Sequence, residues 1–104
     1  MIKVAYNRCY GGFSLSPQAS KLVNALKGGE EVVDPKFGFV YIPRHDPDLI
    51  EAIETLGTEE ASSTYASISI EIVKGDRYRI QEYDGLEWVE TPDTIDWIVV
   101  ESDE

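Results

Sequence analysis

The spacing of apolar residues changes part-way along the chain, and this change constrains the fold more than any other feature. Ser16-Pro17 and Asp46-Pro47 each place a capping side chain before a proline, as at a helix start, and apolar residues follow both at helical spacing. From about residue 66 the apolar residues instead alternate with polar ones, as in strands, and Asp84-Gly85 marks a two-residue hairpin turn. Helices followed by strands are typical of the α+β class.

We therefore expect one α+β domain over residues 1–104, a mostly antiparallel sheet with two helices on one face. The expected order is β-α-β-α-β-β-β. The helices begin at Pro17 and Pro47, and they end at Gly28-Gly29 and Gly57. Strands are expected over residues 2–6, 37–42, 66–72, 78–83 and 86–89, with a last one over 95–100.

Composition excludes several classes of protein. The chain carries a formal net charge of −11, so direct binding to nucleic acid is not expected. Its apolar runs fall far below the ~20 residues of a membrane-spanning helix, so no membrane partner is expected. Cys9 is the only cysteine, which excludes an internal disulfide framework and favours a reducing cytoplasm. No metal site or other cofactor is expected, because His45 is the only histidine and the carboxylates lack ligand spacing.

The charge is distributed unevenly. Residues 1–29 hold four basic residues and no Asp or Glu, which gives +4. Residues 30–104 hold the other five basic residues and all 20 acidic ones, which gives −15. Such asymmetry indicates an interaction surface for something negative near the N-terminus, although a short acid-free stretch also arises by chance.

The segment from Tyr6 to Pro17 is the strongest candidate binding site. A predicted strand runs into Gly11-Gly12 and then into a helix N-terminus, whose free N–H groups and dipole attract phosphate. Guanidinium and hydroxyl groups bind phosphate, and aromatic rings stack on bases. The residues assigned to ligand binding are Tyr6, Arg8, Tyr10, Gly11, Gly12, Phe13, Ser14 and Ser16. The segment matches neither a Walker loop nor the GxGxxG fingerprint. In the alternative interpretation the glycines only form a turn, Ser16 only caps the helix and the aromatic side chains fill the core.

A second candidate segment, Arg44-His45, lies at the start of the next predicted helix. Arg44 is expected to complete a phosphate clamp and His45 to stack or donate a hydrogen bond, so both join the ligand-binding set. The alternative for Arg44 is an ion pair with one of the many carboxylates. No catalytic residue is assigned, because nothing local brings Cys9 and His45 together as a nucleophile and base.

Three segments resemble a widespread family of short phage and viral proteins. They are Tyr6-Asn7-x-Cys9-Tyr10-Gly11-Gly12-Phe13-Ser14-Leu15-Ser16, Arg44-x-Asp46-Pro47-x-Leu49-Ile50-Glu51 and Glu82-Tyr83-Asp84-Gly85-x-Glu87. The pattern is similar to that of viral anti-CBASS sponge proteins, which bind cyclic dinucleotide immune signals, form oligomers and do not cleave the ligand. One departure is that Thr94-Ile95-Asp96-Trp97 stands where family members often carry a His-Arg-Thr-Trp-like segment.

The resemblance implies a phage-encoded, non-catalytic protein of the host cytoplasm that sequesters a cyclic dinucleotide and so blocks anti-phage defence. It also implies a homo-oligomer with a small cyclic nucleotide as its partner. An alternative is an acidic interaction protein that imitates DNA. It would inhibit a host nucleic-acid-binding factor through residues 30–104, which carry the net charge of −15. A third, a small hydrolase or nucleotide-modifying enzyme, would depend on Cys9 or His45.

Overall fold

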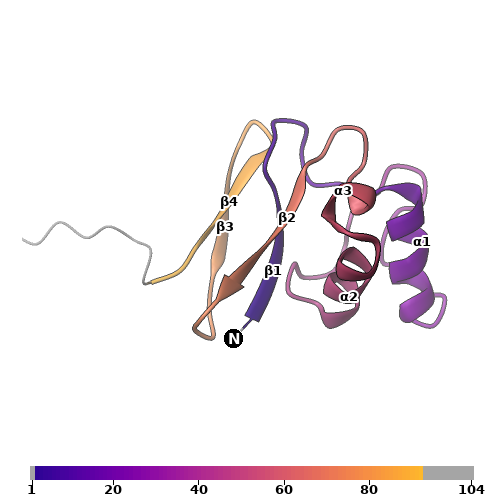
Figure 1. Cartoon of the computed structure of the whole chain (residues 1–104), viewed down its shortest axis with the longest axis horizontal. Helices are drawn as coiled ribbons and strands as arrows, with labels where there is room; N and C mark the ends of the chain where they lie inside the picture. Colours follow the sequence, from indigo (N-terminus) through magenta and orange to yellow (C-terminus); the bar gives the residue numbers. More distant parts are fainter. Residues whose placement is uncertain (1, 93–104) are drawn as a thin grey trace, which may run out of the picture.

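The structure, a computed structural model, describes residues 2–92 of the chain, and these residues form three layers (Figure 1). The helices lie on one side of the β1–β2 sheet and the β3–β4 hairpin lies on the other. The elements are β1 (Ile2–Asn7), α1 (Pro17–Leu26), α2 (Pro47–Leu56), α3 (Thr58–Ala61), β2 (Ile68–Val73), β3 (Arg79–Tyr83) and β4 (Leu86–Glu90). The α+β class expected from the sequence is confirmed.

Both sheets are antiparallel and two-stranded. In the first, Ile2 lies opposite Val73 and the β1 strand runs back along β2 as far as Asn7. In the second, the strands are joined by Asp84 and Gly85, whose φ angles of 52° and 90° are both positive. Positive φ at both central residues defines the type I′ turn that Asp-Gly favours, so the predicted hairpin is confirmed.

The two long helices begin where their caps predict. The Ser16 hydroxyl accepts a hydrogen bond from the Ala19 N–H at 3.2 Å, and Pro17 occupies the first helical position. The Asp46 carboxylate accepts from the Asp48 N–H at 2.9 Å and from the Leu49 N–H at 3.3 Å. These caps satisfy N–H groups that a helix leaves free, which explains why the starts were predictable from local sequence.

The main core lies between the helices and one face of the β1–β2 sheet. Its fully buried members come from β1, the loops and all three helices: Ala5, Leu15, Ala19, Val23, Val33, Leu49, Ala52, Ile53 and Ala61. Because side chains alternate along a strand, Val4 and Val73 point to the opposite face, and both are buried on the side of the hairpin. Val4 and Val73 are therefore buried outside the main core.

Three details differ from the sequence prediction. Residues 37–42 do not form a strand: Val40 makes an isolated bridge with Val33, because Gly38 at φ 76° turns the chain between them. The segment after Gly57, where neither a helix nor a strand was expected, contains the short helix α3, so a third helix joins the two that were expected. The strand expected over 95–100 lies outside the described residues.

Within residues 2–92, no helix combines the length and the apolar character needed to cross a membrane.

Candidate functional site

An open pocket of about 430 Å³ lies where three loops meet beside the start of α1. We call it the loop pocket. Its lining residues come from residues 11–17, 35–39 and 63–65: Gly11, Ser14, Leu15, Pro17, Pro35, Lys36, Phe37, Phe39, Ser63, Thr64 and Tyr65. Its volume falls in the range of small-molecule sites. Of the residues predicted to bind ligand, Gly11 and Ser14 line it.

Two glycines allow the three loops to approach closely enough to form this pocket. A Cβ on Gly11 would overlap the carbonyl oxygen of Tyr65, and a Cβ on Gly38 would overlap the carbonyl oxygen of Leu15. The Leu15 N–H donates to the Gly38 carbonyl at 2.9 Å, so the 35–39 loop is fastened to the segment before α1. The walls are therefore fixed by backbone contacts rather than by the lining side chains.

Aromatic rings form one wall of the loop pocket and leave much of their surface free. Phe37 and Phe39 are 57% and 52% exposed, and their rings stack with centroids 5.9 Å apart and planes 28° from parallel. Tyr65 is 74% exposed at the rim. Stacked and exposed ring faces of this kind bind the flat faces of bases.

The Asp34 side chain shapes the loop that carries these rings. Its carboxylate accepts hydrogen bonds from the N–H groups of Lys36 at 2.8 Å and Phe37 at 3.4 Å. The Lys36 ammonium lies 5.2 Å from the centroid of the Phe37 ring. A positive charge therefore lies over an aromatic ring, and this loop presents a cation and an aromatic surface together.

Hydroxyl groups also line the loop pocket. The Ser14 and Ser63 hydroxyls are 2.6 Å apart, and the Ser63 N–H donates to the Ser14 carbonyl at 3.2 Å. The Ser63 hydroxyl also accepts from the Tyr65 N–H at 3.2 Å, and Thr64 lies between them in the lining. The pocket thus combines ring faces, one cation and hydroxyls, and its lining contains no carboxylate.

The start of α1 contributes less to anion binding than the sequence suggested. Pro17 has no N–H group, and the Ala19 N–H is capped by the buried Ser16 side chain. The Ser20 N–H donates to the Ser16 carbonyl, and the Ser16 N–H donates to Ala61 in α3. Ser16 therefore acts as a cap, the alternative interpretation of this residue.

Arg44 is held away from the loop pocket at a junction between β1 and β4. Its guanidinium donates to both carboxylate oxygens of Glu87, at 2.6 and 2.9 Å, and lies 3.8 Å from the ring centroid of Phe13. The Glu87 carboxylate is 8% exposed and also accepts from the Asn7 N–H at 2.9 Å. We call Asn7, Phe13, Arg44 and Glu87 the central junction. Arg44 thus has the carboxylate partner that the alternative interpretation expected.

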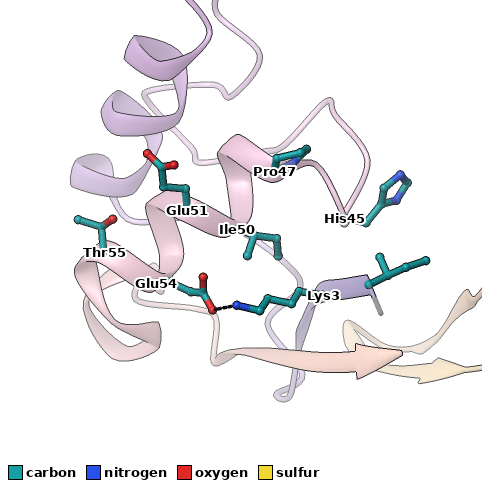
Figure 2. Close-up of a pocket in the computed structure, with 8 residues that line it drawn as sticks. Lys3, His45, Pro47, Ile50, Glu51, Glu54 and Thr55 are labelled. Atoms are coloured by element: carbon teal, nitrogen blue, oxygen red, sulfur yellow. Dashed lines mark hydrogen bonds and ion pairs between the residues drawn. The ribbon is translucent and has the colours of Figure 1, made fainter. Parts of the chain in front are cut away.

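His45 lies in a different and wider depression of about 610 Å³ beside α2 (Figure 2). Its Nδ1 atom is 2.6 Å from the hydroxyl of Tyr78, and burial raises the pKa of that tyrosine. Lys3 in the same depression is paired with Glu54 at 2.7 Å, as the dashed line in Figure 2 shows. His45 is therefore separated from the loop pocket.

The remaining predicted residues surround the Gly11-Gly12 bend. Gly85 of the hairpin turn packs against it so closely that a Cβ there would overlap the Tyr10 carbonyl oxygen. Tyr10 and Arg8 are exposed, and Tyr6 is half-buried in β1 opposite Ser69. The Arg8 N–H donates to the Ser67 carbonyl at 2.7 Å, and none of Tyr6, Arg8, Tyr10 and Gly12 lines the pocket.

The residues that make up most of the loop pocket were not predicted from the sequence. Lys36, Phe37 and Phe39 fell in or next to a predicted strand, and Ser63 and Tyr65 fell between the second predicted helix and the strand expected over 66–72. The available signal was Phe37-Gly38-Phe39 after Asp34-Pro35, because a turn-forming pair and a glycine between two aromatics favour an exposed loop.

No family model, curated protein or solved structure matches this chain. Within residues 2–92 no group of three or more His, Cys, Asp or Glu side chains is arranged to hold a metal ion.

Proposed function

We propose that this chain is a non-catalytic nucleotide-binding protein that sequesters a cyclic dinucleotide signal, and that the loop pocket is its binding site. The observation that carries the proposal is the combination of exposed rings, Lys36 and hydroxyls around one pocket in a chain of net charge −11. Because most of the chain is acidic, a phosphate meets the least charge repulsion at a pocket whose lining has no carboxylate.

The geometry supports a nucleotide better than a simple anion. Phe37 and Phe39 offer ring faces for a base, and Lys36 stands beside them for a phosphate. The hydroxyls of Ser14, Ser63 and Thr64 suit a sugar or the remaining phosphate oxygens. The pocket is large enough for one half of a dinucleotide, and its open side leaves room for the other half.

The proposal assigns binding rather than turnover to this pocket. Cys9 and His45 do not line it, and neither does any carboxylate. The resemblance of residues 6–16 to short phage proteins supplies the ligand class and the proposed role against host defence.

Isothermal titration with cyclic dinucleotides of guanine and adenine tests the proposal. Base–aromatic stacking contributes roughly 1–3 kcal/mol per base, so Phe37→Ala and Phe39→Ala should each weaken binding by about 5- to 150-fold. Tyr41→Ala is the matched control, because Tyr41 is an exposed aromatic on the same segment that does not line the pocket.

Two outcomes contradict the proposal. One is the absence of heat across the panel at high protein concentration. The other is equal weakening by Tyr41→Ala and Phe39→Ala, which would place the ligand elsewhere. Mass spectrometry of the nucleotide released by heat should recover it unchanged; cleavage or modification would replace sequestration with catalysis.

A further inference from the structure

The strand β3 has an open edge. It pairs with β4 along one side, and among residues 2–92 no backbone group pairs with the other side. An open edge offers unpaired N–H and C=O groups to a further strand, and proteins that stay monomeric usually block it. β3 contains no proline, and its sequence is Arg-Ile-Gln-Glu-Tyr.

The hairpin turn determines which groups face this edge. In a two-residue turn the flanking residues, Tyr83 and Leu86, form the closing hydrogen-bonded pair. Opposite residues in an antiparallel ladder alternate between bonded and non-bonded pairs. The backbone groups of Gln81 therefore face β4, while those of Ile80 and Glu82 face the open edge.

The two ends of β3 carry charges of opposite sign. Residues 74–79, the segment before β3 and its first residue, contain Lys74, Arg77 and Arg79 with one acid, Asp76, a net charge of +2. Arg77 is paired with Asp76 at 3.4 Å and Arg79 with Glu90 of β4 at 2.8 Å. Residues 82–84 contain Glu82 and Asp84 and no base, a net charge of −2. An antiparallel copy of the strand would place each positive end beside a negative end. Such matching favours a second copy over an unrelated basic or acidic partner.

We propose that two copies of this chain associate through their β3 strands, related by a two-fold axis at Gln81. Ile80 and Glu82 then bond to the partner's Glu82 and Ile80, which satisfies all four edge-facing backbone groups of each strand. The product is a continuous four-stranded antiparallel sheet. Its symmetry is isologous and closed, so no third copy is added at this edge.

The outer face of the hairpin fits this arrangement. Arg79, Gln81 and Tyr83 share that face with Leu86, Trp88 and Glu90, because these residues lie opposite one another in the ladder. Tyr83 and Trp88 are exposed on it. Arg79 comes to lie opposite the partner's Tyr83, where a guanidinium and an aromatic ring attract each other.

A disulfide cross-link tests the register directly. Gln81 lies opposite the partner's Gln81 in a non-bonded pair, where Cα atoms are roughly 4.5 Å apart and a disulfide can form. Full-length Gln81→Cys, with Cys9→Ser, should yield a covalent dimer when oxidised by oxidised glutathione. Glu51→Cys in the same background, exposed on α2, is the matched control and should remain largely uncross-linked.

A proline variant tests the edge itself. Glu82→Pro removes an edge-facing N–H, whereas Glu82→Ala removes the same side chain and keeps the N–H. Sedimentation of the full chain at low salt should show a dimer whose dissociation constant rises at least tenfold in Glu82→Pro relative to Glu82→Ala. Circular dichroism of both variants confirms that the hairpin is retained.

Charge reversal tests the complementarity. Lys74→Glu with Arg77→Glu should weaken the dimer and reduce its sensitivity to salt. A full chain that stays monomeric at several hundred micromolar, or that forms a dimer unaffected by Glu82→Pro, overturns the proposal. If the chain is monomeric and Gln81→Cys forms no cross-link, the open edge of β3 is instead covered by another part of the chain or by another protein. These tests use no nucleotide, so their outcome is independent of the loop pocket.

Discussion

Phe13 and Ser14 are neighbours in the chain, but they belong to two regions that use polar groups in opposite ways. The Phe13 ring carries Arg44 in the central junction, where the buried polar side chains are hydrogen-bonded to one another or to the backbone. Ser14 lines the loop pocket, where the Phe37, Phe39 and Tyr65 rings are exposed rather than buried in the fold. Satisfied buried groups stabilise a fold, whereas exposed groups on a fixed frame are available for binding.

Glu87→Ala should have the largest effect on stability. It removes the carboxylate that accepts from the half-buried Arg44 guanidinium and the Asn7 N–H, and leaves Arg44 only the Ala5 carbonyl at 3.5 Å. Breaking a buried ion pair from one side costs about 3–5 kcal/mol. Chemical denaturation measures this loss in the free energy of unfolding. Ligand affinity of the folded fraction should stay within about twofold, because the junction does not line the pocket.

Glu87→Gln is the control for this prediction, since it removes the charge but keeps an oxygen acceptor for Arg44 and Asn7. It should recover part of the loss. A stable Glu87→Ala protein with reduced nucleotide affinity would reverse the roles of the two regions and return Arg44 to the binding site.

Gly38→Ala should affect both regions of the comparison at once. Gly38 lies in the chain between the pocket-lining Phe37 and Phe39, but it is buried, has a φ of 76° and touches the Leu15 backbone. Alanine at positive φ loses more than about 1 kcal/mol, and the overlap with Leu15 adds to this. We expect a lower unfolding free energy together with weaker nucleotide binding, measured by denaturation and titration.

Gly28→Ala separates the backbone strain at positive φ from the steric overlap with Leu15. Gly28 has a similar φ of 75°, but its Cβ would meet nothing within 4 Å. It should therefore show the backbone strain alone and leave affinity unchanged. Equal destabilisation by both variants would mean that the contact with Leu15 does not hold the pocket wall.

Local signals predicted most of the fold, and contacts between distant residues account for what they missed. Ser16-Pro17, Asp46-Pro47 and Asp84-Gly85 each contain their own cap or turn, so they could be interpreted without the rest of the chain. The Phe37–Ile42 segment looks like a strand in isolation, but it bends at Gly38 to meet Leu15, 23 positions earlier.

The candidate site was less predictable for the same reason. The loop pocket joins residues near 14, 37 and 63, and no local pattern indicates that these loops meet. Arg44 had both a phosphate and a carboxylate as possible partners in the sequence. Only the placement of β4 beside β1 brings Glu87 to it.

The ion pair between α1 and α2 provides the smallest and last test. Its side chains are 26% and 13% exposed, close to the 24% and 8% of the Arg44–Glu87 pair in the central junction. Lys27 after α1 donates to Asp46 before α2 at 2.7 Å. Partial burial pushes the pKa of Asp46 upward, but hydrogen bonds from Lys27 and from the Asp48 and Leu49 N–H groups outweigh it, so the pKa lies below its ordinary value. A lowered pKa means that Asp46 stabilises the fold above its unfolded-state pKa, and that this contribution is lost as pH falls through the folded-state pKa.

Asp46→Ala should lower the free energy of unfolding by about 1 kcal/mol through the lost helix cap. Asp46→Asn keeps the cap, so it should lower the free energy of unfolding by less than Asp46→Ala does. It should also reduce the dependence of that free energy on pH at acidic pH. Denaturation between about pH 2 and 6, which spans the usual carboxylate pKa values, measures this. A loss in Asp46→Asn as large as that in Glu87→Ala would show that Asp46 stabilises the fold through its charge interaction with Lys27 rather than through the helix cap.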